Sequence, residues 1–148
     1  MSFKPYYPST CRLAYAPEAA SQTFVQGNLV YIDTDGYLAE CASDPTAVAG
    51  VAAEDASNGS AAAKQTGYWA ADMGAVFVAK SNTTTAHTQR GASYGTVLSA
   101  SVHYVDISEV TAKVVYIIDL DPRDAVGASG GRYLVSFTTV AAQGTKAA

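Results

Sequence analysis

Apolar and polar residues alternate with a period of two along much of this chain, and short stretches rich in Gly, Asp and Asn interrupt the alternation. In "LVYID", Leu29 and Tyr31 share one face of an extended segment, and Val30 and Ile32 share the other. The "DTDG" that follows suits a tight turn in which Gly36 adopts positive φ, and "YLAEC" returns the chain. The pattern therefore predicts a β-hairpin around this turn.

Further segments have the composition of strands, because they are rich in β-branched and aromatic residues and are bounded by turn residues. Gly50, in the middle of one of them, predicts a bulge or the close approach of another backbone. The segments on either side of "MG" (73–74) are expected to pair with each other. Alternate residues of the last segment, from Tyr133 to Phe137, are expected to share one face. The segments are "TAVAGVAAED" (46–55), "TGYWAAD" (66–72), "GAVFVAK" (74–80), "TVLSASVHYVDI" (96–107), "KVVYIIDLD" (113–121) and "RYLVSFTTV" (132–140).

The first residues, 1–22, predict an extended N-terminal arm, because their prolines fix φ and remove backbone donors. Such a segment is expected to lie along a surface rather than inside a sheet. Residues 23–140 then form one β domain, and residues 141–148 form a flexible C-terminal tail. Removal of residues 1–12 is accordingly expected to leave the domain folded.

The composition favours an all-β fold. The chain has 15 Val, 6 Leu, 4 Ile and 4 Phe, and ten tyrosines add apolar area. β-branched and aromatic side chains pack well on a pleated sheet, whereas a chain poor in leucine makes weak helical cores. A length of 148 residues suits one domain. We therefore predict an all-β, single-domain barrel or sandwich with an extended N-terminal arm.

The charge pattern argues against two classes of partner. The net charge is −4 and the nine Lys and Arg are scattered singly, whereas a nucleic-acid-binding protein needs a basic surface. No apolar run reaches the roughly 18–20 residues that span a bilayer, and residues 1–21 lack the apolar core of a secretory signal. Cys11 and Cys41 lack the spacing of a zinc site, and we expect both to be free thiols.

Few side chains have a pattern suited to catalysis or metal binding. His103 lies within a strand pattern, where we interpret it as a wall residue, and His87 lies in a Thr-rich loop. The carboxylates of "DTDG" and "DLDPRD" lack the spacing of a calcium loop, so we interpret the first pair as turn residues. In the second group, Arg123 is expected to pair with Asp121 or Asp124. No Ser occupies a G-x-S-x-G turn. We predict a protein that is not an enzyme and that binds no metal or cofactor.

Three consecutive segments resemble the capsid decoration, or cement, proteins of tailed phages. Those families combine a "G-[DN]-x-V-x-x-[DN]-x-x-G-x-[LV]" hairpin with a "[IV]-x-G-V-A" strand and a later strand ending in "G-x-[VL]-[FW]-x-[VA]". The section "IIDLDPRDAVGASGGRYLVSF" is also similar to the end of such proteins. The resemblance covers residues 26 to about 138 but not "SNTTTAHTQRGASYG". The matching positions are Gly27, Asn28, Val30, Gly36, Leu38, Val48, Gly50, Val51, Ala52, Gly74, Val76 and Phe77.

This resemblance implies a β-tulip-like protein that binds the major capsid protein on the outer surface of the virion and stabilises the shell, as a homotrimer. It implies no catalytic residue and neither a nucleic-acid nor a membrane partner. Interfaces are enriched in aromatic residues and Arg, so we expect the arm to supply anchors. The interface residues expected on this basis are Phe3, Tyr6, Tyr7, Arg12, Tyr15 and Trp69.

Two other functions compete with this one. A β module that binds carbohydrate or a host surface would use Trp69 and several tyrosines as stacking platforms. A small hydrolase has little to support it beyond scattered Asp and His residues.

Overall fold

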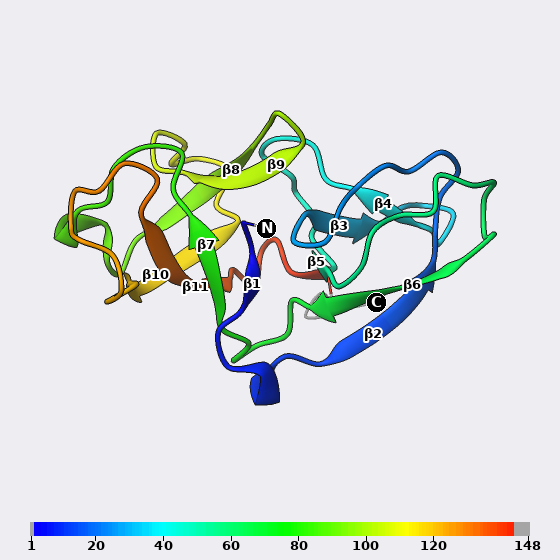
Figure 1. Ribbon diagram of the computed structural model, residues 1–148, viewed down its shortest axis with the longest axis horizontal. Coiled ribbons are helices and arrows are strands. Elements are labelled where there is room, and N and C mark those ends of the chain that lie inside the picture. The colour runs from blue at the N-terminus through cyan, green and yellow to red at the C-terminus, as the bar shows by residue number, and fades with distance from the viewer. Residues whose placement is uncertain (1, 144–148) are drawn as a thin grey trace.

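The computed structural model describes residues 2–143, which form eleven β-strands and two 3-10 turns, η1 (Pro8–Thr10) and η2 (His87–Gln89). The strands belong to two sheets that lie side by side (Figure 1). The all-β prediction is therefore confirmed.

The first sheet has six strands, and every neighbouring pair is antiparallel. This sheet curls on itself, because a parallel bridge joins Ser81 to Val105. Ser81 follows the second strand in the order given next, and Val105 belongs to the last. The strand order is β1 (Lys4–Pro5), β7 (Phe77–Lys80), β11 (Arg132–Phe137), β10 (Val115–Leu120), β8 (Ser93–Ser99) and β9 (Val102–Asp106).

The second sheet has five antiparallel strands. It also curls, because a bridge joins Glu18, which follows the first strand, to Leu38 in the last strand. The order is β2 (Leu13–Pro17), β6 (Gln65–Ala70), β5 (Gly50–Ala52), β3 (Leu29–Ile32) and β4 (Leu38–Glu40).

The predicted hairpin is confirmed as β3 and β4, paired from Val30↔Glu40 to Ile32↔Leu38. Asp33 Oδ1 accepts hydrogen bonds from the backbone N–H groups of Asp35 and Tyr37, at 3.0 and 2.9 Å, which fixes the turn. The two faces of β3 pack in different cores. Leu29 belongs to the main core between the sheets, whereas Val30 belongs to a small core within the second sheet.

Gly50 behaves as its position in a strand predicts. A Cβ placed on Gly50 would lie 1.9 Å from the carbonyl oxygen of Trp69, so the backbone of β6 approaches it too closely for any side chain. The last strand also matches its prediction, because Tyr133, Val135 and Phe137 are all buried on one face of β11.

The pairing predicted around residues 73–74 is wrong. β6 pairs with β2 and β5 in the second sheet, whereas β7 pairs with β1 and β11 in the first. Ala71 and Ala75, on either side of the turn, are both buried in the main core. The connection therefore passes from one sheet to the other over the exposed turn at Met73 and Gly74, with a small buried residue on either side of it.

The separate N-terminal arm is also corrected. β1 pairs with β7 and β2 pairs with β6, so residues 4–17 contribute an edge strand to each sheet. Phe3 is fully buried, and its ring stacks on Phe137 with a centroid distance of 6.1 Å. The prolines are consistent with edge positions, where a missing N–H breaks no ladder bond. The expectation that the domain folds without residues 1–12 is not compatible with this packing.

Part of the predicted C-terminal tail is packed too. Ala141 and Ala142 are buried, and the backbone N–H of Val48 donates to the carbonyl oxygen of Ala141 at 2.8 Å. The side chain of Gln143 both donates to and accepts from the backbone of Ile32. The prediction for residues 144–148 lies outside the described residues.

Candidate interaction surface

Three large apolar side chains of residues 7–15, the segment that leads into and along β2, are exposed. Tyr7 is 52% exposed, Leu13 48% and Tyr15 61%. Leu13 and Tyr15 alternate with Ala14, so they share one face of the strand. Both lie across Gly67 of β6, where an added Cβ would be 3.2 Å from the Tyr15 ring and 3.5 Å from the Leu13 side chain. We call Tyr7, Leu13 and Tyr15 the exposed apolar strip.

The structure separates the predicted interface residues into three groups. Phe3 is wrong as a surface anchor, because it lies in the core. Tyr6 and Trp69 are half-buried. The ring of Tyr6 packs against that of Tyr7 with a centroid distance of 4.6 Å, and Trp69 packs against the main core. The remaining three, Tyr7, Arg12 and Tyr15, are exposed.

Sequence reasoning missed Leu13, which lies two residues before Tyr15 on the same face of β2. The spacing i, i+2 in "LAY" was the available signal, since alternate residues of a strand lie on one side. Treating the segment as an arm, and not as a strand, concealed that relationship.

Arg12 is not a free cation. Its guanidinium donates two hydrogen bonds to the carboxylate of Asp72, at 2.9 and 3.1 Å, and these hydrogen bonds raise the pKa of Arg12. The pair ties the start of β2 to the turn that follows β6. Because Arg12 is exposed, the pair contributes at most about 1 kcal/mol to stability.

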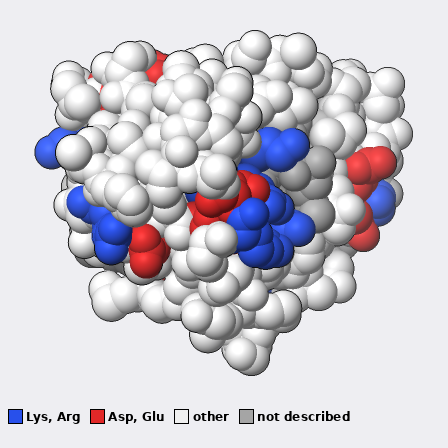
Figure 2. All heavy atoms as spheres, turned by 60° about the vertical axis from the view of Figure 1, so that its left-hand side comes forward, with Lys and Arg blue, Asp and Glu red and all other residues white. Residues whose placement is uncertain are grey.

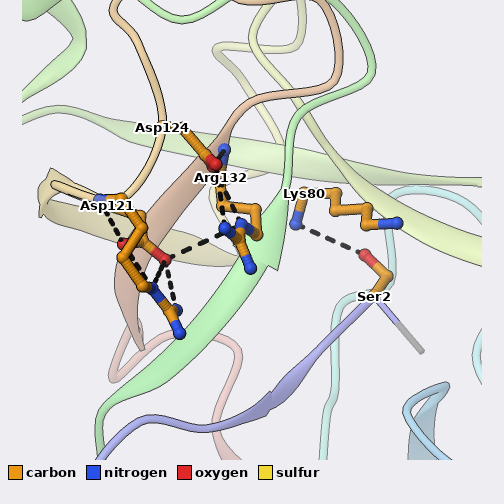
Figure 3. A network of polar contacts seen from close by, with 6 residues as sticks. Ser2, Lys80, Asp121, Asp124 and Arg132 are labelled. Atoms are coloured by element: carbon orange, nitrogen blue, oxygen red, sulfur yellow. Dashed lines mark hydrogen bonds and ion pairs between the residues drawn. The ribbon is translucent and has the colours of Figure 1, made fainter.

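Figure 2 shows acidic and basic side chains side by side in a central group and in smaller groups toward both sides, surrounded by uncharged surface. An ion-pair network of this kind, on β11 and the loop before it, is drawn in Figure 3. Asp121 is buried and accepts hydrogen bonds from Arg123, which confirms the predicted pairing. The side-chain hydrogen bond from Arg123 lowers the pKa of Asp121.

The same network contains a second arginine that the sequence did not assign. Arg132 donates from Nε and Nη2 to the carboxylate of Asp124, both at 2.8 Å, and also lies 3.7 Å from Asp121. In Figure 3 the side chain of Lys80 extends away from Arg132, and its backbone N–H donates to Ser2 Oγ at 3.4 Å. The carboxylates therefore brace the 121–132 loop against β11.

His103 is buried where the two sheets meet, and both ring nitrogens are hydrogen-bonded. Nδ1 accepts from the backbone N–H of Leu29 at 3.1 Å, and Nε2 lies 2.8 Å from the carbonyl oxygen of Cys41. A backbone N–H only donates and a carbonyl only accepts, so the ring is neutral with its proton on Nε2. Burial lowers the pKa of His103. The imidazole thus serves as a structural bridge, which extends the wall interpretation.

The remaining buried carboxylate, Glu18, also has a structural role. It accepts hydrogen bonds from the backbone N–H and hydroxyl of Ser57 and from the hydroxyl of Thr66. These bonds attach the loop after β5 to the end of β2. Within residues 2–143, no three His, Cys, Asp or Glu side chains are grouped so that they could hold a metal ion.

Both cysteines are free thiols, as predicted. Cys41 is buried, and burial raises its pKa far above the ordinary value. Cys11 is half-buried, and its Sγ donates to the carbonyl oxygen of Val76 at 3.6 Å.

A second apolar feature lies away from the strip. Met73, in the turn after β6, is 78% exposed and borders an open hollow of about 390 Å³. Tyr116 of β10 and the hydroxyl side chains of Ser93, Ser136 and Thr138 line the same hollow, and none of the described residues that line it is charged. Its lining suits an apolar contact better than proton-transfer chemistry.

No protein-family model, curated protein or solved structure matches the chain. The resemblance to decoration proteins therefore rests on the sequence motifs. In the part of the chain that the structure describes, no helix has the length and apolarity to cross a bilayer.

Proposed function

We propose that this protein is a capsid decoration protein of a tailed phage. It would bind the major capsid protein on the outer surface of the virion, stabilise the shell and turn over no substrate. The order of the three sequence motifs supports the proposal, as does the all-β fold.

The observation that carries the proposal is the exposed apolar strip. Three large apolar side chains within nine residues are about half exposed, at positions fixed by a strand and by the turn before it. Full burial of such a side chain contributes roughly 1.5–3 kcal/mol, so covering the exposed half of each gains about 1 kcal/mol. Contacts of this strength suit a protein that acts by adhesion and in several copies.

Three copies acting together raise the affinity well above that of one. A gain of about 3 kcal/mol per copy corresponds to a factor of roughly 10² in binding, before the costs of association. In a homotrimer that docks all copies at once, the second and third contacts form within one particle, and avidity increases by orders of magnitude. The trimer expected from the resemblance is therefore part of the proposal.

The test uses capsids assembled without this protein from the major capsid protein of the same genome. Wild-type protein is expected to co-sediment with the capsids, to give ordered density on the outer surface by cryo-electron microscopy, and to raise the temperature at which shells rupture. Deletion of the first residues is unsuitable as a variant, because Phe3 and β1 belong to the fold.

The decisive variant is Tyr7→Ser, with Val110→Ser as the control at an exposed apolar residue away from both apolar features. Loss of about 1 kcal/mol per copy predicts a fall in affinity of about fivefold per contact, and about a hundredfold for a trimer. The control should retain wild-type occupancy. Absence of wild-type binding to these capsids would refute the proposed function.

A further inference from the structure

Two residues on the outer edge of β2 have backbone groups without a hydrogen-bond partner among residues 2–143. The backbone N–H of Ala70 donates to Arg12 O, and that of Glu18 donates to Lys64 O, so the even-numbered residues of β2 face β6. Alternation along an antiparallel ladder then directs the N–H and C=O groups of Leu13 and Tyr15 away from β6. β2 ends the strand order of its sheet and lies at the border of the molecule in Figure 1.

This edge is short and ends at Pro17, but it has no charged residue and no bulge, which are other features that protect natural edge strands from pairing with another strand. β2 reads "LAYAP", with no charged residue and with a regular register against β6 from Leu13 to Pro17. Arg12, at its start, is neutralised by Asp72. Nothing in the strand repels an identical strand.

The open edge also has a defined length. Pro17 has no N–H, and the N–H of Cys11 already donates to Pro8 O at 3.2 Å. The donors directed outward are therefore the two of Leu13 and Tyr15, flanked on both sides by positions that cannot extend a ladder. An edge of this length is short, and its side chains are the large exposed ones.

We propose that two copies of this chain pair through β2, antiparallel and two-fold symmetric about Ala14. In this register Leu13 lies opposite the partner's Tyr15 and exchanges two hydrogen bonds with it, and the symmetric pair adds two more. All four outward groups of each copy are then satisfied. The exposed side chain of Leu13 packs beside the aromatic ring of the partner's Tyr15, a favourable cross-strand combination.

The neighbouring register would form fewer hydrogen bonds. Pairing about Tyr15 would place Leu13 opposite the partner's Pro17, and the carbonyl of Leu13 would then face a residue without a donor. The position of the proline therefore selects the register about Ala14.

This inference uses Leu13 and Tyr15, which the proposed function also assigns to the capsid contact, but it is tested separately. A two-fold contact pairs an edge with itself, whereas a three-fold contact joins two different surfaces, so the β2 contact would link copies between trimers and not within one. Measurements of self-association on free protein and of binding to capsids report the two proposals separately.

The test is sedimentation velocity of the full-length protein from micromolar to millimolar concentration. We expect a concentration-dependent two-fold association, which Tyr15→Lys weakens by about tenfold or more, since it introduces an edge lysine and removes the cross-strand aromatic contact. Val110→Lys, the control at an exposed apolar residue away from β2, should associate as the wild type does. Unchanged circular dichroism and midpoints of unfolding would show that both variants are folded.

A double variant tests the register itself. In Leu13→Glu with Tyr15→Lys, each new glutamate faces a new lysine across the proposed two-fold, so association should recover relative to Tyr15→Lys alone. In Leu13→Lys with Tyr15→Lys, like charges face each other, and association should be lost. The inference is overturned if the wild type shows no two-fold association up to millimolar concentration, if Tyr15→Lys associates as tightly as the control, or if the two double variants behave alike.

Discussion

The neutral bridge made by His103 predicts that stability decreases as the pH falls below about 6.5. Cys41 N–H donates to Leu29 O at 2.9 Å, but the ladder between β3 and β4 stops at Val30↔Glu40. The imidazole takes the place of the missing return bond, accepting from Leu29 and donating to Cys41. Protonation of Nδ1 would direct one donor against another in a buried site.

The sign of the effect follows from the lowered pKa of His103. The unfolded chain binds a proton near the ordinary value of about 6.5, whereas the folded chain resists it, because burial disfavours the charged ring. This contribution is therefore complete above about pH 6.5 and is lost as the pH falls toward the folded-state pKa. The slope is at most about 1.4 kcal/mol per pH unit in that window.

A loss of about 1.4 kcal/mol per pH unit is large relative to the total stability expected for one domain, about 5–15 kcal/mol. Truncation of the ring would cost more than the titration, since the N–H of Leu29 and the carbonyl of Cys41 would both lose their partner. Each such buried group costs about 1–3 kcal/mol, and the cavity adds to that. His103→Ala is therefore expected to lose roughly 3–5 kcal/mol.

The assay is urea unfolding at 25 °C from pH 8 to pH 5, followed by circular dichroism and by the fluorescence of Trp69, the single tryptophan. Working above pH 5 limits the contribution of ordinary carboxyl groups. His103→Gln should lose the slope, and His87→Gln, at an exposed position of η2, should retain it. A free energy of unfolding that stays constant between pH 7 and pH 5, or equal slopes for wild type and His103→Gln, would refute the neutral bridge.

Three further changes test the packing by their effect on urea midpoints. Phe3→Ala should cost about 3–5 kcal/mol, whereas the exposed control Met73→Ala should change stability by about 0.5 kcal/mol or less; equal midpoints would contradict the burial of Phe3. Thr96→Val should stabilise by about 1 kcal/mol, because the buried hydroxyl has no hydrogen-bond partner among the described residues; a loss would point to an unseen partner. Ala100→Asn with Ser101→Gly should add about 1 kcal/mol, since both turn residues between β8 and β9 have positive φ; a destabilised hairpin would contradict that geometry.

Features that depend on neighbours in the sequence could be predicted. The turn at Asp33, the opposite faces of Leu29 and Val30, and the one-sided burial of β11 all follow from alternation and turn chemistry over fewer than ten residues. Gly50 belongs with them, because a strand glycine implies an approach even before the approaching chain is known.

Features that depend on partners far along the chain could not be predicted from the sequence. The bridge from His103 joins residues 62 and 74 positions away, and no local pattern identifies Cys41 or Leu29 as its partners. The prediction that β6 and β7 pair was wrong for a related reason. Two strands joined by a short turn usually pair, and only the pairing of β6 with β2 and β5, and of β7 with β1 and β11, shows that these do not.

Phe3 shows how a correct rule about the backbone can give a wrong conclusion about a side chain. Proline confines a strand to the edge of a sheet, and β1 and β2 are indeed edge strands. An edge strand nevertheless has one face turned toward the core, and the residue next to it can be buried as deeply as any in a central strand. The same reasoning applied to Leu13 and Tyr15 gives the opposite outcome, because their shared face remains exposed. The backbone rule therefore locates the open edge of β2, and the burial of each side chain decides which residues along it are free to bind a partner.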